Sequence, residues 1–279
     1  MASMEERGIT DSGQRRELLE RGHRVADDCK MNKNILLGLV IGLSGGFFGG
    51  LAGLGGGVIM IPMMTAFVGL AQREAHGTSL VAVVFTGAVG ALTYFYHGTV
   101  DWKAALILAA SAMFFARMGA LYAHSLPERS LKRGFGIFMI AVSLLMIAKA
   151  WLPGASGGLA FWPQMLVLLL TGTATGFVSG MMGVGGGSIM IPAMVILAGM
   201  PQHLVQGTSL LAMVPVGITG AFTHHRLGNV HSNLAIGLAA GAIVGGFIGG
   251  TVAHQLPDFS LKVIFACIGL WMGVKYARG

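Results

Sequence analysis

The sequence predicts an all-α polytopic membrane protein built from two repeats with inverted topology. Hydrophobic residues make up 54% of the chain and charged residues only 10%, whereas a soluble domain carries roughly 25% charged residues. Several apolar runs approach or exceed the ~20 residues that a helix needs to cross a bilayer. A distinctive glycine-rich stretch also occurs once in each half of the chain.

The repeat is marked by a glycine turn at 53–62 and again at 183–192, with the shared pattern GxGGGxIMIP. Each turn is followed, at 77–80 and at 207–210, by the tetrapeptide GTSL. Equivalent positions differ by 130 throughout, without a gap. Self-similarity at a fixed offset indicates two copies of one structural unit.

This offset defines the expected parts of the chain. The stretch 152–158 reads LPGASGG, which is typical of a linker. The charged N-terminal tail is too long for a secretory signal, and Met31 resembles a second natural start, so whether the tail belongs to the natural chain stays open. The expected parts are a polar tail at 1–32, a first repeat at 33–151, a linker at 152–161 and a second repeat at 162–279.

Five helical segments are expected in each repeat, and the second of each set is unusually short. At 1.5 Å per residue these short segments span roughly 20 Å, less than the ~30 Å hydrocarbon core. Pro62 and Pro192 lie in their early turns, where proline is tolerated, so both segments are predicted to be half-helices that begin inside the membrane. The segments are at about 34–52, 58–70, 77–97, 103–124 and 131–150, and at about 162–181, 188–200, 207–226, 231–253 and 260–276.

The predicted inversion follows from counting crossings. The first two segments of each repeat return the chain to its starting side, and three crossings remain, so the second copy sits upside down. Basic residues of short loops collect on the cytoplasmic side, which predicts that both termini are cytoplasmic. A parallel arrangement with four crossings per half stays open, if the first two segments form one broken crossing. The basic residues on the predicted inner side are Arg73, Arg129, Lys132, Arg133, Arg226, Lys275 and Arg278.

Glycines at four-residue intervals predict close helix packing. Small residues on one face let the backbones of membrane helices approach each other. The three series are Gly42, Gly46 and Gly50; Gly172, Gly176 and Gly180; and Gly241, Gly245 and Gly249.

The two glycine turns are the predicted binding elements. Glycine lets a ligand approach the main chain, and a helix that starts after the break directs free N–H groups and partial positive charge at it, which suits an anion. The Thr-Ser pairs stand at the predicted starts of 77–97 and 207–226, where hydroxyls cap a helix or donate to a ligand. Paired interrupted segments are typical of a transporter site, and the alternative is that these residues serve packing and capping only. The candidates are Gly53, Gly55, Gly56, Gly57, Thr78, Ser79, Gly183, Gly185, Gly186, Gly187, Thr208 and Ser209.

These motifs resemble the sulfite exporter TauE/SafE family. The doubled GxGGGxIMIP turn, the GTSL that follows it, and the related stretches GALYAHSLP at 119–127 and GGTVAHQLP at 249–257 carry the resemblance, which covers about 34–276. It implies transport of small anions, such as sulfite or an organosulfonate, across the bacterial inner membrane without a cofactor. Only the name of the family favours export, and the resemblance transfers no catalytic residue.

Arg117 departs from the repeat, because its equivalent is Phe247. An ionisable residue inside a membrane segment is a functional hypothesis by default, and the forked donors of arginine suit oxyanions. Arg117 is therefore a further candidate substrate-binding residue, and Arg117→Ala is expected to abolish anion transport. The alternative is a side chain that snorkels to the membrane surface.

Histidine is the residue that titrates near neutral pH, so coupling of transport to protons through His76 or His97 stays open. Most histidines fall at predicted segment ends, where an interfacial position explains them. They are His76, His97, His124, His224, His225, His231 and His254.

Other function classes are weighed against the anion transporter. An uptake permease or a passive pore for the same anions stays open, as does transport of a soft metal cation, since thioethers favour such ions. The sequence has no HExxH motif, no P-loop lysine and no paired intramembrane carboxylates, so no enzyme activity is predicted, and the cysteines have no metal-site spacing. The net charge of +7 is spread over termini and loops, which argues against nucleic acid. The methionines near the turns are Met60, Met63, Met64, Met181, Met182, Met190 and Met194.

Overall fold

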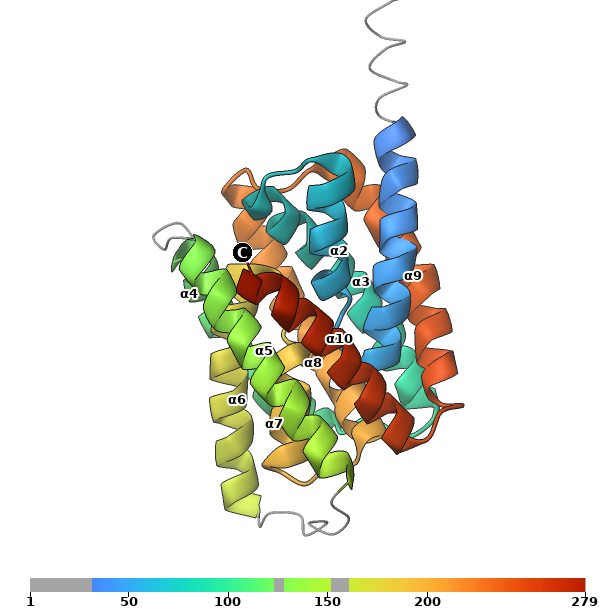
Figure 1. Ribbon diagram of the computed structural model, residues 1–279, viewed down its shortest axis with the longest axis vertical. Helices are drawn as coiled ribbons and strands as arrows, with labels where there is room; N and C mark the ends of the chain where they lie inside the picture. The colour runs from blue at the N-terminus through green and yellow to red at the C-terminus, as the bar shows by residue number, and fades with distance from the viewer. Residues whose placement is uncertain (1–31, 123–127, 152–160, 279) are drawn as a thin grey trace, which may run out of the picture.

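The computed structural model describes residues 32–122, 128–151 and 161–278 (Figure 1). Over these residues the chain is helical, without a strand. All but the last residue of the predicted tail, most of the predicted linker and His124 lie outside the described residues. After a first helix, Asn32–Ala52, the elements are α2 (Gly57–Met63), the π-helix η1 (Met64–Val68), α3 (Gln72–Tyr96), α4 (Trp102–Tyr122), α5 (Glu128–Trp151), α6 (Phe161–Met182), α7 (Gly187–Ile196), α8 (Gln202–Arg226), α9 (Ser232–Ala253) and α10 (Asp258–Arg278).

Helix length and composition confirm a helical membrane protein. Within the described ranges, seven helices are long and apolar enough to cross a membrane. They are the first helix, α3, α4, α6, α8, α9 and α10. Two of the shorter apolar helices, Gly57–Val68 and Gly187–Ile196, follow the two glycine turns, as the half-helix prediction requires.

Helices pack mainly between the two halves of the chain. Helix α4 lies along α6, α3 contacts both α8 and α9, and α5 contacts α10. The predicted glycine series make the close contacts: a Cβ on Gly46 would lie 2.7 Å from the carbonyl oxygen of Ala242, and a Cβ on Gly172 would lie 2.6 Å from that of Leu108. The backbones touch at these positions, which confirms the packing role of the small residues.

Equivalent helices of the two halves run antiparallel. Along α3 and α8, Gly87 lies against Leu210, whereas Gly77, one end of α3, lies against His224 near the far end of α8. The same reversal holds for α5 and α10, where Gly136 contacts Gly273. In Figure 1 the first helix and α6, its equivalent, accordingly start at opposite ends of the molecule.

The predicted starts of 77–97 and 207–226 are wrong by five residues. Helices α3 and α8 begin at Gln72 and Gln202, so the GTSL motif lies in the second turn rather than at the helix start. The first turn of α3 is polar and therefore reads as a loop in the sequence. It is stabilised by Glu74, whose carboxylate accepts a hydrogen bond from the Ala71 N–H at 3.2 Å.

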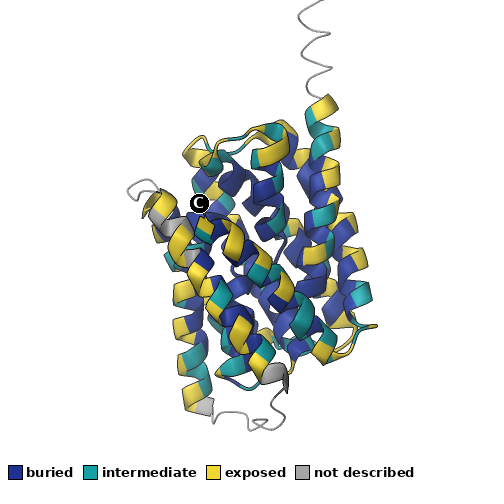
Figure 2. Cartoon of the chain, in the orientation of Figure 1, coloured by how far each residue is buried: buried dark blue, intermediate teal, exposed yellow. Residues whose placement is uncertain are grey.

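Buried residues fill the middle of the bundle, and exposed residues line the outer faces of helices such as α5 and α10 (Figure 2). Most methionines near the turns belong to two hydrophobic clusters that make up this interior. Flexible thioethers fill irregular gaps in a core, so packing accounts for their positions. The buried members are Met60, Met64, Met181, Met182, Met190 and Met194.

Candidate functional site

The two glycine turns meet at the centre of the molecule. A Cβ on Gly57 would lie 2.6 Å from the carbonyl oxygen of Gly183, and a Cβ on Gly187 would collide with the carbonyl oxygen of Gly53. Each half-helix therefore begins directly against the backbone of the opposite turn. The structure thus brings the predicted glycines of both copies together.

Six of these glycines have positive φ angles that other residues rarely adopt. The equivalent positions in the two turns match one another, so both turns have the same backbone shape. They are Gly53 (72°), Gly55 (77°) and Gly56 (82°), and Gly183 (63°), Gly185 (90°) and Gly186 (78°).

Ser79 and Ser209 hold the turns in place across the interface between the halves. Ser79 Oγ donates to the carbonyl oxygen of Gly183 at 2.9 Å, and Ser209 Oγ donates to that of Gly53 at 3.0 Å. Each hydroxyl also lies within hydrogen-bond distance of a carbonyl in its own helix. Both serines are fully buried, so they position the turns.

Thr78 and Thr208 contact a different element of the opposite half. Thr78 Oγ1 accepts a hydrogen bond from the N–H of His231, which precedes α9, and Thr208 Oγ1 accepts one from the N–H of Asp101, which precedes α4. The expectation that these hydroxyls cap their own helices is wrong, because they lie in the second turn and support the starts of neighbouring helices.

The space around the turns is closed by apolar side chains. A Cβ on Gly55 would lie 2.8 Å from Met213 Sδ, and one on Gly185 would lie 3.1 Å from Val83 Cγ1. Val83 and Met213 are equivalent residues of α3 and α8, and both are fully buried. A ligand that passes between the turns needs these helices to move.

Two residues with hydroxyl groups stand beside the second turn, and the first turn has no equivalents of them. Helix α6 places Thr175 and Ser179 beside Gly186, since a Cβ on this glycine would lie 2.5 Å from Thr175 Cγ2 and 3.7 Å from Ser179 Cβ. Ser188, in the first turn of α7, is also buried. The first half has no hydroxyl at any of the three equivalent positions, which are Gly45, Gly49 and Val58.

The hydroxyls of Thr175 and Ser179 are buried and have no hydrogen-bond partner among the described residues. By contrast, Thr86 in α3 and Thr219 in α8 each donate to the carbonyl oxygen four residues earlier. A buried polar atom without a partner destabilises the fold by about 1–3 kcal/mol. Two such donors beside a helix N-terminus are therefore suited to a ligand with acceptor oxygens.

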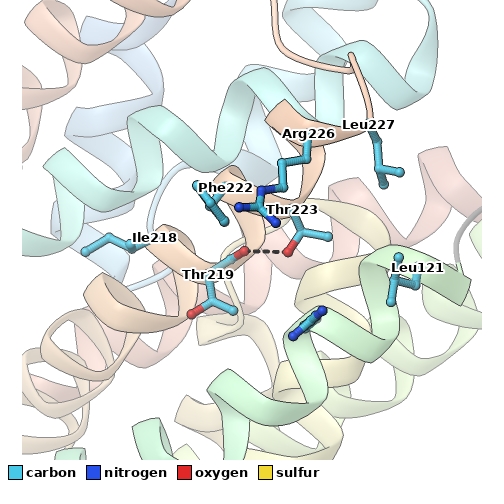
Figure 3. A pocket seen from close by; sticks show the side chains of 8 residues that line it. Leu121, Ile218, Thr219, Phe222, Thr223, Arg226 and Leu227 are labelled. Carbon is cyan, nitrogen blue, oxygen red and sulfur yellow. Dashed lines mark hydrogen bonds between the residues drawn. The ribbon is translucent and has the colours of Figure 1, made fainter.

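Arg117 lies apart from the turns. It lines a pocket of about 370 Å³ between α4 and α8, together with Arg226, Thr219 and Thr223 (Figure 3). No glycine-turn residue lines this pocket. The guanidinium of Arg226 packs over the Phe222 ring, 4.4 Å from its centroid, and the Thr223 hydroxyl donates to the Thr219 carbonyl. The two arginines make this pocket positively charged.

Two histidines that the sequence suggested to be interfacial are buried instead. His76 and His224 are 5% and 1% exposed, and His224 Nε2 lies 3.0 Å from the carbonyl oxygen of Gly180, just before the second turn. Their equivalents in the repeat are Gln206 and Tyr94. Tyr94 Oη donates to Gln206 Oε1 at 3.0 Å, and Gln206 Nε2 lies 3.3 Å from the Leu51 carbonyl oxygen. Sequence reasoning missed Gln206 and Tyr94, although the departure from the repeat was a signal.

Comparison with known proteins supports the family resemblance that the repeated motifs carry. The family described as "Sulfite exporter TauE/SafE" matches residues 38–276. The chain belongs to this family. As a TauE/SafE protein it is a membrane transporter and not an enzyme.

Relatives of this TauE/SafE chain cover most of its length. It is 29% identical over 259 residues to "Probable membrane transporter protein YunE" of Bacillus subtilis (strain 168), which is 85% of this chain and 95% of the relative. It is 31% identical over 202 residues to a "Probable membrane transporter protein" of Xylella fastidiosa (strain Temecula1), which is 69% of this chain and 76% of the relative. No solved structure matches the chain.

Proposed function

We propose that this protein is a secondary transporter for a small anion, such as sulfite or an organosulfonate, and that the anion binds at the second glycine turn. The observation that carries the proposal is the pair of unpartnered, fully buried hydroxyls of Thr175 and Ser179 beside Gly186. In the first turn of α7, which begins at Gly187, the N–H groups of Gly187 and Ile189 bond to the carbonyl oxygens of Gly185 and Gly186. The turn therefore offers an anion the N–H of Ser188 and the partial positive charge of the helix start. Together these groups form a set of donors for an oxyanion.

Electrostatics favours an anion at this place over a cation. The N-terminus of a helix carries partial positive charge equivalent to roughly half an elementary charge. Hydroxyls and N–H groups replace the water that a sulfur oxyanion loses on entering the protein. Gly185 and Gly186 carry no side chain of their own, and Val83 and Thr175 lie against them, so an anion reaches this backbone only when these neighbours move.

Transport in this proposal is alternating access between two inverted halves. The antiparallel pairing of α3 with α8 and of α5 with α10 supports the inverted repeats. Since Val83 and Met213 close the centre, relative movement of α3 and α8 opens the site to one side at a time. Export, a bacterial inner-membrane location and cytoplasmic termini complete the proposal, on the strength of the family resemblance and the basic loops.

Arg117 and Arg226 attract the anion before it reaches the turns. Positive charge at an entrance raises the local concentration of an anionic substrate. Because their pocket lies apart from the glycine turns, we expect Arg117→Ala and Arg226→Ala to raise KM more than they lower kcat. Complete loss of transport at saturating substrate in Arg117→Ala would instead place Arg117 at the central site.

The test is thermal stabilisation of the detergent-purified protein by sulfite, sulfate, thiosulfate, sulfoacetate, taurine, acetate and copper(I). A ligand that binds only the native state raises its apparent stability. The proposal expects stabilisation by a sulfur oxyanion, and loss of that effect in Thr175→Val and Ser179→Ala. Stabilisation by copper(I) alone would contradict it.

The same variants separate binding from a structural role. Replacing a buried hydroxyl that lacks a partner by an apolar group is neutral or stabilising, so the ligand-free variants should unfold at the same or a higher temperature than the wild type. Thr86→Val is the matched control, since its hydroxyl already donates to the Ala82 carbonyl. It should leave anion stabilisation unchanged. If an anion stabilises Thr175→Val as much as it stabilises the wild type, the Thr175 hydroxyl is not part of the site.

A further inference from the structure

Three histidines gather at the end of the molecule where α3 ends and α8 begins. The rings of His97 and His254 stack with centroids 3.9 Å apart and planes 19° apart, and His203 lies 5.5 Å from His254. They come from the C-cap of α3, the first turn of α8 and the C-cap of α9. At the positions equivalent to His97 and His203 the other repeat has Leu227 and Arg73, so the cluster belongs to one end only.

The hydrogen bonds of His254 provide for two protonation states. Its Nδ1–H donates to the Gly250 carbonyl at 2.8 Å, and its Nε2 lies 3.0 Å from Thr99 Oγ1. Thr99 Oγ1 also lies 3.0 Å from the Tyr94 carbonyl oxygen. With Nε2 unprotonated, the Thr99 hydroxyl donates to it. With Nε2 protonated, the ring donates to Thr99, and the hydroxyl turns its hydrogen to the Tyr94 carbonyl.

His203 is bonded differently, because both of its ring nitrogens face acceptors. Nδ1 contacts the Asp258 carboxylate, and Nε2 lies 3.2 Å from the Ala253 carbonyl oxygen. Only a ring protonated on both nitrogens makes both bonds at once. The contact with Asp258 ties the start of α10 to α8.

The cluster is connected to the first glycine turn through buried side chains. The Tyr94 ring lies edge-on to His254 with centroids 4.5 Å apart. Tyr94 Oη donates to Gln206, and the Gln206 amide contacts the carbonyl oxygen of Leu51, two residues before Gly53. A change in the charge of His254 therefore acts on a side chain that holds the first turn.

We propose that His97, His203 and His254 form the binding site for a proton that is exchanged during anion transport, with Thr99 switching its hydrogen bond as His254 gains or loses the proton. This inference rests on the proposed function. The proton enters from the exposed edge at His97 and adds positive charge beside Tyr94. Two further titratable side chains contact the cluster, Tyr94 at His254 and Asp258 at His203. Asp101, two residues after Thr99, caps the start of α4 with its carboxylate.

The experiment records proton movement with an internal pH dye in liposomes across which a sulfite gradient is imposed. The proposal expects the wild type to move protons together with sulfite, and the triple variant His97→Gln/His203→Gln/His254→Gln to exchange sulfite for sulfite without moving protons. Thr99→Val, which leaves all three histidines in place, should shift the pH profile of the coupled flux. His225→Gln, an exposed histidine at the opposite end of α8, is the matched control and should behave as the wild type.

Each of the other outcomes rules out one part of the proposal. Proton movement in the triple variant equal to that of the wild type overturns the histidine site while sulfite transport stands. Net sulfite flux down the imposed gradient by the wild type without proton movement overturns proton coupling itself. No exchange of sulfite, sulfoacetate or taurine by a folded wild-type protein overturns the proposed function and the coupled proton with it.

Discussion

Ser209 shows how a single hydroxyl joins the two halves of the chain. It donates to Gly53 in the opposite turn and lies close to the carbonyl oxygen of Gln206. Ser209→Ala leaves the buried Gly53 carbonyl without this donor, so we expect a loss of about 1–3 kcal/mol of stability, measured by thermal unfolding in detergent. Ser44→Ala, whose exposed hydroxyl donates within its own helix, should change stability by less than about 0.5 kcal/mol. Equal effects of the two substitutions would refute the positioning role.

His254 makes the folding stability of the protein depend on pH. Burial lowers the pKa of His254, the hydrogen bond to Gly250 opposes this shift, and the neighbouring His97 and His203 add to it. The unfolded chain therefore binds this proton at a higher pH than the folded protein does. Folding stability is consequently lost as the pH falls below the ordinary histidine pKa of about 6.5.

The corresponding measurement compares unfolding temperatures at pH 7.5 and at pH 5.5 for the wild type and His254→Gln. We expect a smaller decrease in the variant, because glutamine keeps a polar contact with Thr99 but does not titrate. An identical decrease in both proteins would show that His254 has the same proton affinity in the folded and unfolded chains.

At the scale of the element, the glycine turns combine an unusual backbone with close contact. Gly183 has φ 63°, and a Cβ there would lie 2.6 Å from the His76 carbonyl oxygen. Gly69 also has a positive φ, but no atom lies within 4 Å of its Cβ position. Gly69→Ala should cost about 1–2 kcal/mol for the backbone alone, and Gly183→Ala clearly more, as measured by thermal unfolding. Equal losses would mean that the close approach of Gly183 to the His76 carbonyl contributes nothing.

At the scale of the whole molecule, inverted and parallel repeats make opposite predictions for Gly98 and Gly228. These equivalent residues lie in the turns after α3 and α8, and each faces open space. With Cys29 and Cys267 replaced, Gly98→Cys should react with a membrane-impermeant maleimide in intact cells, and Gly228→Cys only after the cells are opened. Reaction of both residues from the same side would establish parallel repeats.

The sequence predicted the features that depend on repetition and composition: the spans, the half-helices and the two glycine turns. It missed the first turns of α3 and α8, because their polar residues look like loop. Thr175 and Ser179 were recognisable only as departures from Gly45 and Gly49. The His203–Asp258 pair joins positions 55 residues apart, and no local sequence pattern predicts such a contact.

The most direct test of the anion site is counterflow of labelled sulfite into liposomes loaded with unlabelled sulfite. Counterflow requires a binding site that is exposed to each side in turn, and therefore separates a carrier from a passive pore. We predict saturable counterflow by the wild type and its loss in Thr175→Val/Ser179→Ala, with both proteins equally stable and equally reconstituted. Counterflow by this variant at the wild-type rate and KM would contradict an anion site at the second glycine turn.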